Sequence, residues 1–163
     1  MNMFVLLAIV ILMIYTALMI KAGGKVPSSL SASVFDLPYG KRWIWSVVIF
    51  LVCFLCVPTY IDKVSESTKF LAFIAIAGLA FVGAAPLVKD SQDIAYKVHC
   101  AGAVICAVCS QLVLVFNQPW LLLGWIPFVA YEAYRFRNAR KWRTEVFWGE
   151  MVCFASTFAF CLL

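Results

Sequence analysis

Residues that could do chemistry gather in the segment 89–111, which begins with Asp90 and Asp93 and contains His99, the only histidine. Histidine and carboxylate side chains are the usual proton donors and acceptors in enzymes. Any reaction that this protein catalyses would therefore most easily use His99. The aspartates also have a structural explanation, because an acceptor followed by an acid three residues later forms a helix capping box, and Asp93 can pair with Lys97 one turn on. We favour this capping interpretation.

A second group of reactive side chains lies in the first long connection between apolar segments, where four serines precede Asp36. Ser31 or Ser29 could act as a nucleophile with His99 as its base, and Asp36 or Asp93 could orient the histidine, as in serine hydrolases. No nucleophile elbow or glycine-rich oxyanion loop accompanies these residues. A hydrolase is therefore an alternative and not the leading hypothesis.

The serine segment is unusual for a linker because Leu30, Val34, Phe35 and Leu37 alternate with its hydroxyl side chains. Such a mixture suits a short helix that lies at the membrane interface or dips into the mouth of a helix bundle. Serine and aspartate also bond readily to their own backbone, so a simple turn-and-cap segment explains the composition too. We slightly favour the turn.

The third group is the basic run 135–143, which follows Glu132. Arg135 lies three residues after Glu132 and could neutralise it. The run itself could anchor the chain at the cytoplasmic face, hold anionic lipid head groups, or do both. A carboxylate-rich site built from Asp90, Asp93, Glu132 and Glu150 is conceivable, although nothing in the spacing requires it.

The pattern of metal-binding and redox residues is weak. One histidine cannot supply a three-histidine zinc centre, so we expect no metal site and no cofactor. The pairs Cys53/Cys56 and Cys106/Cys109 have redox-type spacing, but both lie in apolar segments where free cysteine behaves as a small hydrophobe. The sequence has no dinucleotide or phosphate-binding motif, and its basic residues are spread out in a way that does not suit nucleic acid.

These groups must be positioned by membrane-spanning helices, since 65% of the 163 residues are hydrophobic, only 13% are charged and the mean hydropathy is +0.98. A crossing needs roughly 17 to 25 apolar residues, and unbroken apolar runs exclude the alternation of a β-barrel. Six stretches approach this length: 3–20, 43–60, 70–88, 94–116, 120–134 and 146–163. In the third, Ala72, Ala80 and Ala84 fall on one stripe, which predicts a central helix that its neighbours approach closely.

Basic residues set the orientation of these spans. Of the 13 basic residues, only Lys63 and Lys69 flank the second and fourth connections, and the other eleven flank the first, third and fifth. Because Lys and Arg are retained on the cytoplasmic side, we predict both termini outside the cytoplasm. We expect a multi-pass protein of a bacterial-type inner membrane.

The connection after the first span carries a family resemblance. The motif from Pro27 to Ser31, followed by Pro38 and an aromatic-rich second span, resembles the DRAM-like six-span membrane proteins. The resemblance implies an association with lipids or membrane trafficking, and it assigns no catalytic residue.

We therefore predict one all-α domain over 1–163, with a cytoplasm-facing polar pocket that binds an anionic lipid head group or a small solute. The protein would act as a carrier, sensor or scaffold, more in keeping with a binding protein than with an enzyme. Membrane lipids are its expected partners, and a homo-oligomer is left open. The expected ligand-binding residues are Ser29, Ser31, Asp93, His99, Glu132 and Arg135. A membrane hydrolase that uses Ser31, His99 and Asp93 on a lipid-borne substrate is the first alternative, and an oligomeric pore is the second.

Overall fold

The computed structural model of the chain describes residues 2–87, 92–137 and 144–163, and the described part consists of helices and their connections. The all-α prediction is confirmed. The helices are α1 (Met3–Gly23), α2 (Trp43–Lys63), α3 (Lys69–Ala84), α4 (Gln92–Asn117), α5 (Trp125–Arg137) and α6 (Glu145–Leu162). Short 3₁₀ helices cover Ala32–Asp36, Tyr39–Lys41, Glu66–Thr68, Ala85–Leu87 and Pro119–Gly124.

Five stretches in the described part are long and apolar enough to cross a membrane, which indicates an integral membrane protein. They are Met3–Gly23, Tyr39–Lys63, Glu66–Leu87, Asp93–Asn117 and Glu145–Leu162. The remaining helix, α5, has 13 residues, and at 1.5 Å per residue it reaches about 20 Å, short of a hydrocarbon core of about 30 Å. Pro127 lies in its first turn, where a missing N–H costs little. Because the 3₁₀ helix Pro119–Gly124 precedes it, α5 begins several residues after the start predicted for the fifth span.

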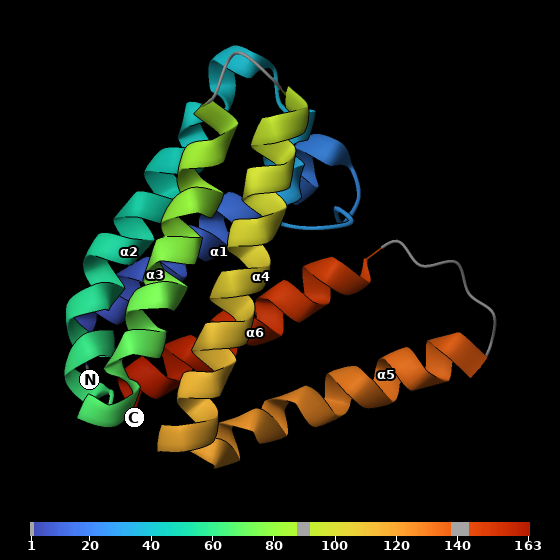
Figure 1. Cartoon of the computed structure of the whole chain (residues 1–163). Coiled ribbons are helices and arrows are strands. Elements are labelled where there is room, and N and C mark those ends of the chain that lie inside the picture. The colour runs from blue at the N-terminus through green and yellow to red at the C-terminus, as the bar shows by residue number, and fades with distance from the viewer. Residues whose placement is uncertain (1, 88–91, 138–143) are drawn as a thin grey trace.

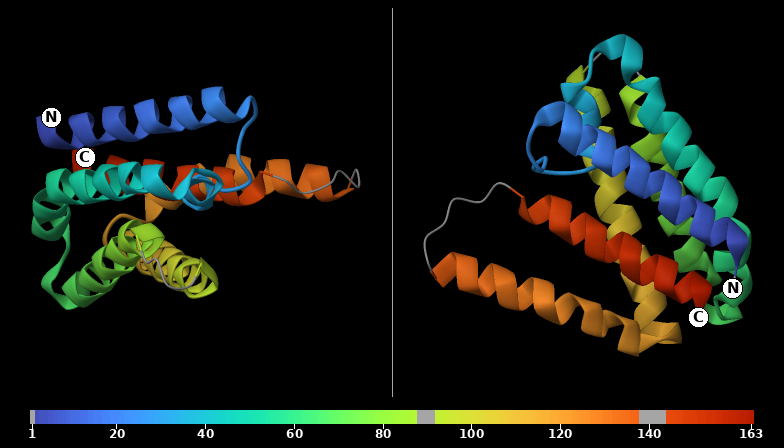
Figure 2. Two further views of the ribbon diagram at one scale, coloured as in Figure 1. Left: turned by 90° about the horizontal axis from the view of Figure 1, so that it is seen from above. Right: turned by 180° about the vertical axis from the view of Figure 1, so that it is seen from behind.

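The helices form an arrangement in which α3 and α4 run side by side, α2 packs on α3, and α1 packs on α2 (Figure 1). Helix α6 contacts α1, α2 and α4, and α5 lies alongside α6. The chain termini lie next to each other in all three views, at the end of the molecule where α2 leads into α3 (Figures 1 and 2). At this end the Asn2 side chain donates to the Thr59 hydroxyl, which fastens the start of α1 to the end of α2.

Helices α3 and α4 approach so closely that their backbones touch. A Cβ atom added to Gly78 would lie 2.7 Å from the carbonyl oxygen of Gly102, and one added to Gly102 would lie 2.7 Å from that of Gly78. Small residues permit such contact between transmembrane helices. The predicted close approach is confirmed, with Gly78 at the contact and Ala80 only partly buried. The predicted central position is not, because α3 packs mainly on α2 and α4, whereas α6 contacts α1, α2, α4 and α5.

The serine segment dips into the bundle and also makes local serine-to-backbone bonds, so both sequence interpretations hold in part. Leu30 and Val34 have no exposed surface, and Ser33 is 2% exposed. The backbone N–H of Phe147, in the first turn of α6, donates to the carbonyl of Ser28 over 3.0 Å. Burial of the apolar side chains places the segment at the start of α6.

Candidate functional site

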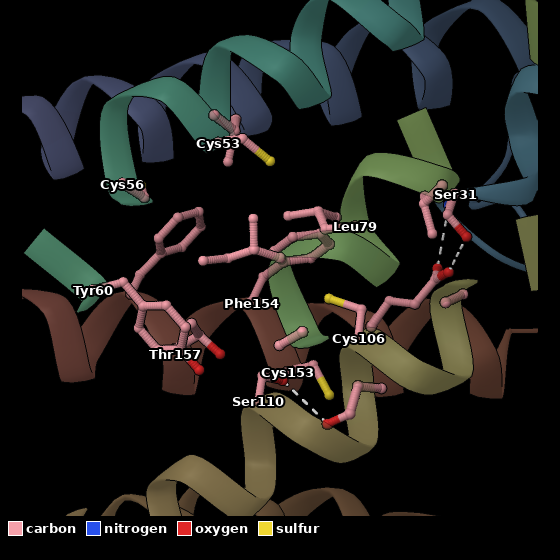
Figure 3. Close-up of a pocket in the computed structure, with 18 of the residues that line it drawn as sticks. Ser31, Cys53, Cys56, Tyr60, Leu79, Cys106, Ser110, Cys153, Phe154 and Thr157 are labelled. Carbon is pink, nitrogen blue, oxygen red and sulfur yellow. Dashed lines mark hydrogen bonds between the residues drawn. The ribbon is translucent and has the colours of Figure 1, made fainter. Parts of the chain in front are cut away.

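The carboxylate of Glu150 is enclosed by donors from the serine segment. Ser29 Oγ lies 2.9 Å and 3.1 Å from its two oxygens, the backbone N–H of Leu30 donates over 2.6 Å, and that of Ser31 over 3.3 Å. The Ser31 hydroxyl donates to Oε1 (Figure 3). Two hydroxyls and two backbone N–H groups therefore surround one carboxylate near the start of α6.

Internal bonds hold the serine segment in the shape that presents these donors. The backbone N–H of Ala32 donates to Ser29 Oγ over 3.0 Å, and Ser33 Oγ donates to the Leu30 carbonyl over 2.6 Å. Leu30 is anchored by its complete burial. The two adjacent N–H groups of Leu30 and Ser31 consequently point toward α6 before any ligand arrives, which is the preorganisation expected of a binding site.

Glu150 has no ion-pair partner within the described part of the chain, whose salt bridges are Lys69–Glu66, Lys97–Asp93, Arg135–Glu132 and Arg135–Glu145. Hydrogen bonds from neutral donors satisfy the lone pairs of a carboxylate but leave its charge in place. An ionisable residue inside a transmembrane helix is costly and usually marks a functional site. Glu150 lies in this position, about one turn inside α6.

Glu150 and Ser31 form one end of a cavity of about 350 Å³ that lies between α2, α3, α4 and α6 (Figure 3). Its walls are mostly apolar and include Val52, Ile76, Leu79, Ala103, Ala107 and Phe154. Tyr60 and Thr157 lie among the lining residues farther along α2 and α6, away from Ser31 (Figure 3). Ligand pockets are typically about 300 to 1,000 Å³, mostly apolar, with few polar groups. The cavity has this composition.

The cavity reaches the outer surface of the bundle between α4 and α6. Val104 on α4 and Val146 on α6 both line it, and their exposed fractions are 63% and 59%. A side chain that lines a cavity and is also exposed lies at its opening. The opening lies between two helices that are both long enough to cross a membrane.

His99 has a structural role that the sequence did not suggest. Pro86 has no N–H and cannot bond the carbonyl of Val82 four residues earlier. Instead, Trp45 Nε1 and His99 Nδ1 each lie 3.1 Å from that oxygen. Since a carbonyl only accepts, His99 Nδ1 carries the proton and Nε2 holds the lone pair. Nε2 is buried and accepts no hydrogen bond from the described residues.

The structure brings only some of the predicted site residues together. Ser29 and Ser31 share Glu150, whereas His99 is occupied with Val82, and no hydrogen bond between described residues joins Ser31 to His99. Asp93 lies on the surface, paired with Lys97 at 2.7 Å as the spacing predicts. Asp90, the other half of the capping box, and most of the basic run lie outside the described residues.

Glu132 and Arg135 form a separate ionic cluster with Glu145. Arg135 lies 3.0 Å from Glu145 and 3.6 Å from Glu132, and the three side chains are 10 to 15% exposed. The predicted pairing of Arg135 with Glu132 is present, and the second carboxylate comes from the start of α6. Two acids surround one guanidinium, so its charge is already balanced within the protein.

Cysteines form a large part of the cavity wall. Cys53, Cys56, Cys106, Cys153 and Cys161 all line it, and all seven cysteines are free thiols. No group of three or more metal-ligating side chains occurs within residues 2–87, 92–137 and 144–163. The thiols therefore contribute small, polarisable surface to the cavity, and they provide a chemical handle on its occupancy.

Glu150 is the residue that sequence reasoning undervalued. The sequence suggests a cluster of Glu150 with Asp90, Asp93 and Glu132, but in the structure Glu150 binds Ser31 while Asp93 pairs with Lys97 and Glu132 with Arg135. The usable signal was an isolated carboxylate inside an otherwise apolar span, a feature that by itself suggests function. Comparisons of the chain with protein-family models, with curated proteins and with solved structures found no significant match, so the DRAM-like resemblance stays a prediction.

Proposed function

We propose that this protein binds a membrane lipid or a similar apolar solute in the cavity between α2, α3, α4 and α6, as a carrier, sensor or scaffold without covalent catalysis. One observation carries the proposal: an apolar cavity of about 350 Å³ ends at a carboxylate and a serine hydroxyl. Such a space fits a chain along its length and a polar group at its end. The lateral opening at Val104 and Val146 supports entry from the bilayer.

We also propose that the chain crosses the membrane six times with both termini outside the cytoplasm. The 3₁₀ helix Pro119–Gly124 has 6 residues and α5 has 13, and the two run on as one arm beside α6 in Figure 1. At about 2.0 and 1.5 Å per residue, the arm is roughly 32 Å long, close to the hydrocarbon thickness. The two chain termini lie next to each other, as expected for a chain that crosses the membrane an even number of times.

The binding proposal is tested by filling the cavity. Ala107→Phe puts a ring into the space that the ligand would occupy, so we expect the purified protein to retain about tenfold less co-purified lipid, a loss of the order of one good apolar contact. The measurement is native mass spectrometry from mild detergent. Ala101→Phe is the matched control, because Ala101 lies on the same helix, is exposed and is absent from the cavity wall.

Two results would overturn the proposal. Equal lipid retention by wild type and Ala107→Phe, with Ala101→Phe also unchanged, would show that the cavity holds nothing. Labelling of the wild type in native membranes by a fluorophosphonate probe, lost on Ser31→Ala, would favour the hydrolase that uses Ser31 and His99 instead. A pore would differ from both by a defined oligomer mass.

A further inference from the structure

The carboxylate of Glu150, one helical turn after Val146, restricts the kind of head group that can lie at this end of the cavity. Glu150 and Ser31 are the charged and hydroxyl groups at this end, and Glu150 has no cationic partner in the described part of the chain. Arg135, the basic residue among the expected ligand-binding residues, already lies against Glu132 and Glu145. Among residues 2–87, 92–137 and 144–163, a phosphate or carboxylate head group would therefore meet the Glu150 carboxylate with no cation paired to it.

Resting on the proposed lipid-binding function, we infer that the ligand is a single-chain amphiphile with a protonated amine at its head. An ammonium group carries three donors and no acceptor. It would take the place of the Ser29 hydroxyl at Glu150 Oε1, since Ser29 Oγ also lies 3.1 Å from Oε2. It would also donate to the oxygen of the Ser31 hydroxyl, which keeps free lone pairs while its own hydrogen points to Glu150. Charge-assisted bonds of this kind are about twice as strong as neutral ones, and they are stronger still away from water.

The remaining cavity accounts for the rest of the ligand. Beyond Ser31 and Glu150 its walls are aliphatic, aromatic and thiol side chains, with Ser110, Thr157 and Tyr60 as the other hydroxyls. At about 350 Å³ it is at the lower end of the usual range of ligand pockets, which suits one chain better than two. The hydroxyl of a long-chain alcohol would also fit at Glu150, but it would leave the negative charge in place.

The experiment uses the cavity thiols of the full-length protein. Wild type in lipid nanodiscs at pH 7.5 is treated with N-ethylmaleimide in the presence of dodecylamine, dodecanol, N-dodecylacetamide or dodecanoate. Peptide mass spectrometry then reports alkylation of Cys106 and Cys153, which line the cavity, and of Cys100, which does not. Cys100 serves as the internal control for amphiphile that merely dissolves in the bilayer.

We expect dodecylamine to protect Cys106 and Cys153 at about one tenth of the concentration of dodecanol or N-dodecylacetamide, with dodecanoate protecting least. Cys100 should be unaffected throughout. In Glu150→Gln the amine should lose its advantage over the alcohol, while protection by the alcohol persists. The comparison of amine with acetamide in wild type does not depend on the variant, so it decides the question even if Glu150→Gln fails to fold.

The outcomes separate this inference from the function on which it rests. Equal protection of wild type by amine, alcohol and acetamide would overturn the amine inference and leave chain binding intact. Stronger protection by dodecanoate than by dodecylamine would also overturn the amine inference, and it would favour a ligand with an anionic head group. Alkylation of Cys106 in wild type without amphiphile is the reference, and failure of every amphiphile to reduce it would overturn the proposed function itself.

Discussion

Single atoms at the ends of the transmembrane helices explain much of this site. The carbonyl oxygen of Val82 is freed because Pro86 cannot donate to it, and Trp45 and His99 supply the missing donors. Ser46 Oγ donates in the same way to the next carbonyl, that of Gly83, over 2.6 Å. A histidine that looks catalytic in the sequence thus serves as a cap for α3.

His99→Leu should therefore lower the stability of the protein without removing its ligand. Losing one of two buried donors to Val82 should cost about 1 to 2 kcal/mol of unfolding free energy, measured by denaturant unfolding in detergent. In a Pro86→Ala background, where residue 86 regains an N–H, the same change should cost less. Loss of bound lipid in His99→Leu at unchanged stability would contradict this assignment and return His99 to the binding site.

At the scale of the helix pairs, the contact between α3 and α4 depends on two glycines. Gly78→Ala would place its Cβ 2.7 Å from the Gly102 carbonyl and 2.8 Å from the backbone nitrogen of Cys106. Backbone atoms cannot move aside as a flexible side chain can, so we expect a loss of about 1 to 3 kcal/mol or more. Thermal unfolding in detergent measures it.

Gly40→Ala is the matched control for this prediction, because nothing lies within 4 Å of a Cβ at Gly40. It should leave the unfolding temperature nearly unchanged. Similar unfolding temperatures for Gly78→Ala and wild type would mean that α3 and α4 are farther apart than the structure shows.

The sequence predicts the helices better than it predicts what joins them. Run length and hydropathy locate the long helices, because an apolar segment in hydrocarbon must satisfy its own backbone hydrogen bonds and does so as an α-helix. Helix α5 is harder, because Pro119 and Gly124 shift its start to Trp125. The course of the serine segment depends on burial of Leu30 and Val34, which local turn preferences do not reveal.

The candidate site shows the same division between local and distant information. The serine segment stands out in the sequence by its composition, so Ser29 and Ser31 could be named. Their partner could not, because Glu150 lies 121 positions after Ser29 and no local spacing links them. Sequence periodicity shows which side of a helix is apolar. Which other helix packs against that side depends on the packing of the whole chain.

For the whole molecule, the distribution of charge and the neighbouring chain ends both favour an even number of crossings. Reporter tags at Met1 and Leu163 should therefore give the same result, with both tags outside the cytoplasm. A tag in the connection between α1 and α2 should face the cytoplasm and is the internal control. Tags on opposite sides would show that the arm of α5 does not cross, leaving the five crossings that helix length alone supports.

The lateral opening at Val104 and Val146 has a thermodynamic consequence for any occupant. A ligand that enters through this opening from the bilayer has already partitioned out of water, and the membrane confines it to a thin layer. Confinement raises its local concentration far above the bulk value. A weak intrinsic affinity would then suffice for occupancy in the cell, and dilution into excess detergent would empty the protein even though nothing in it had changed.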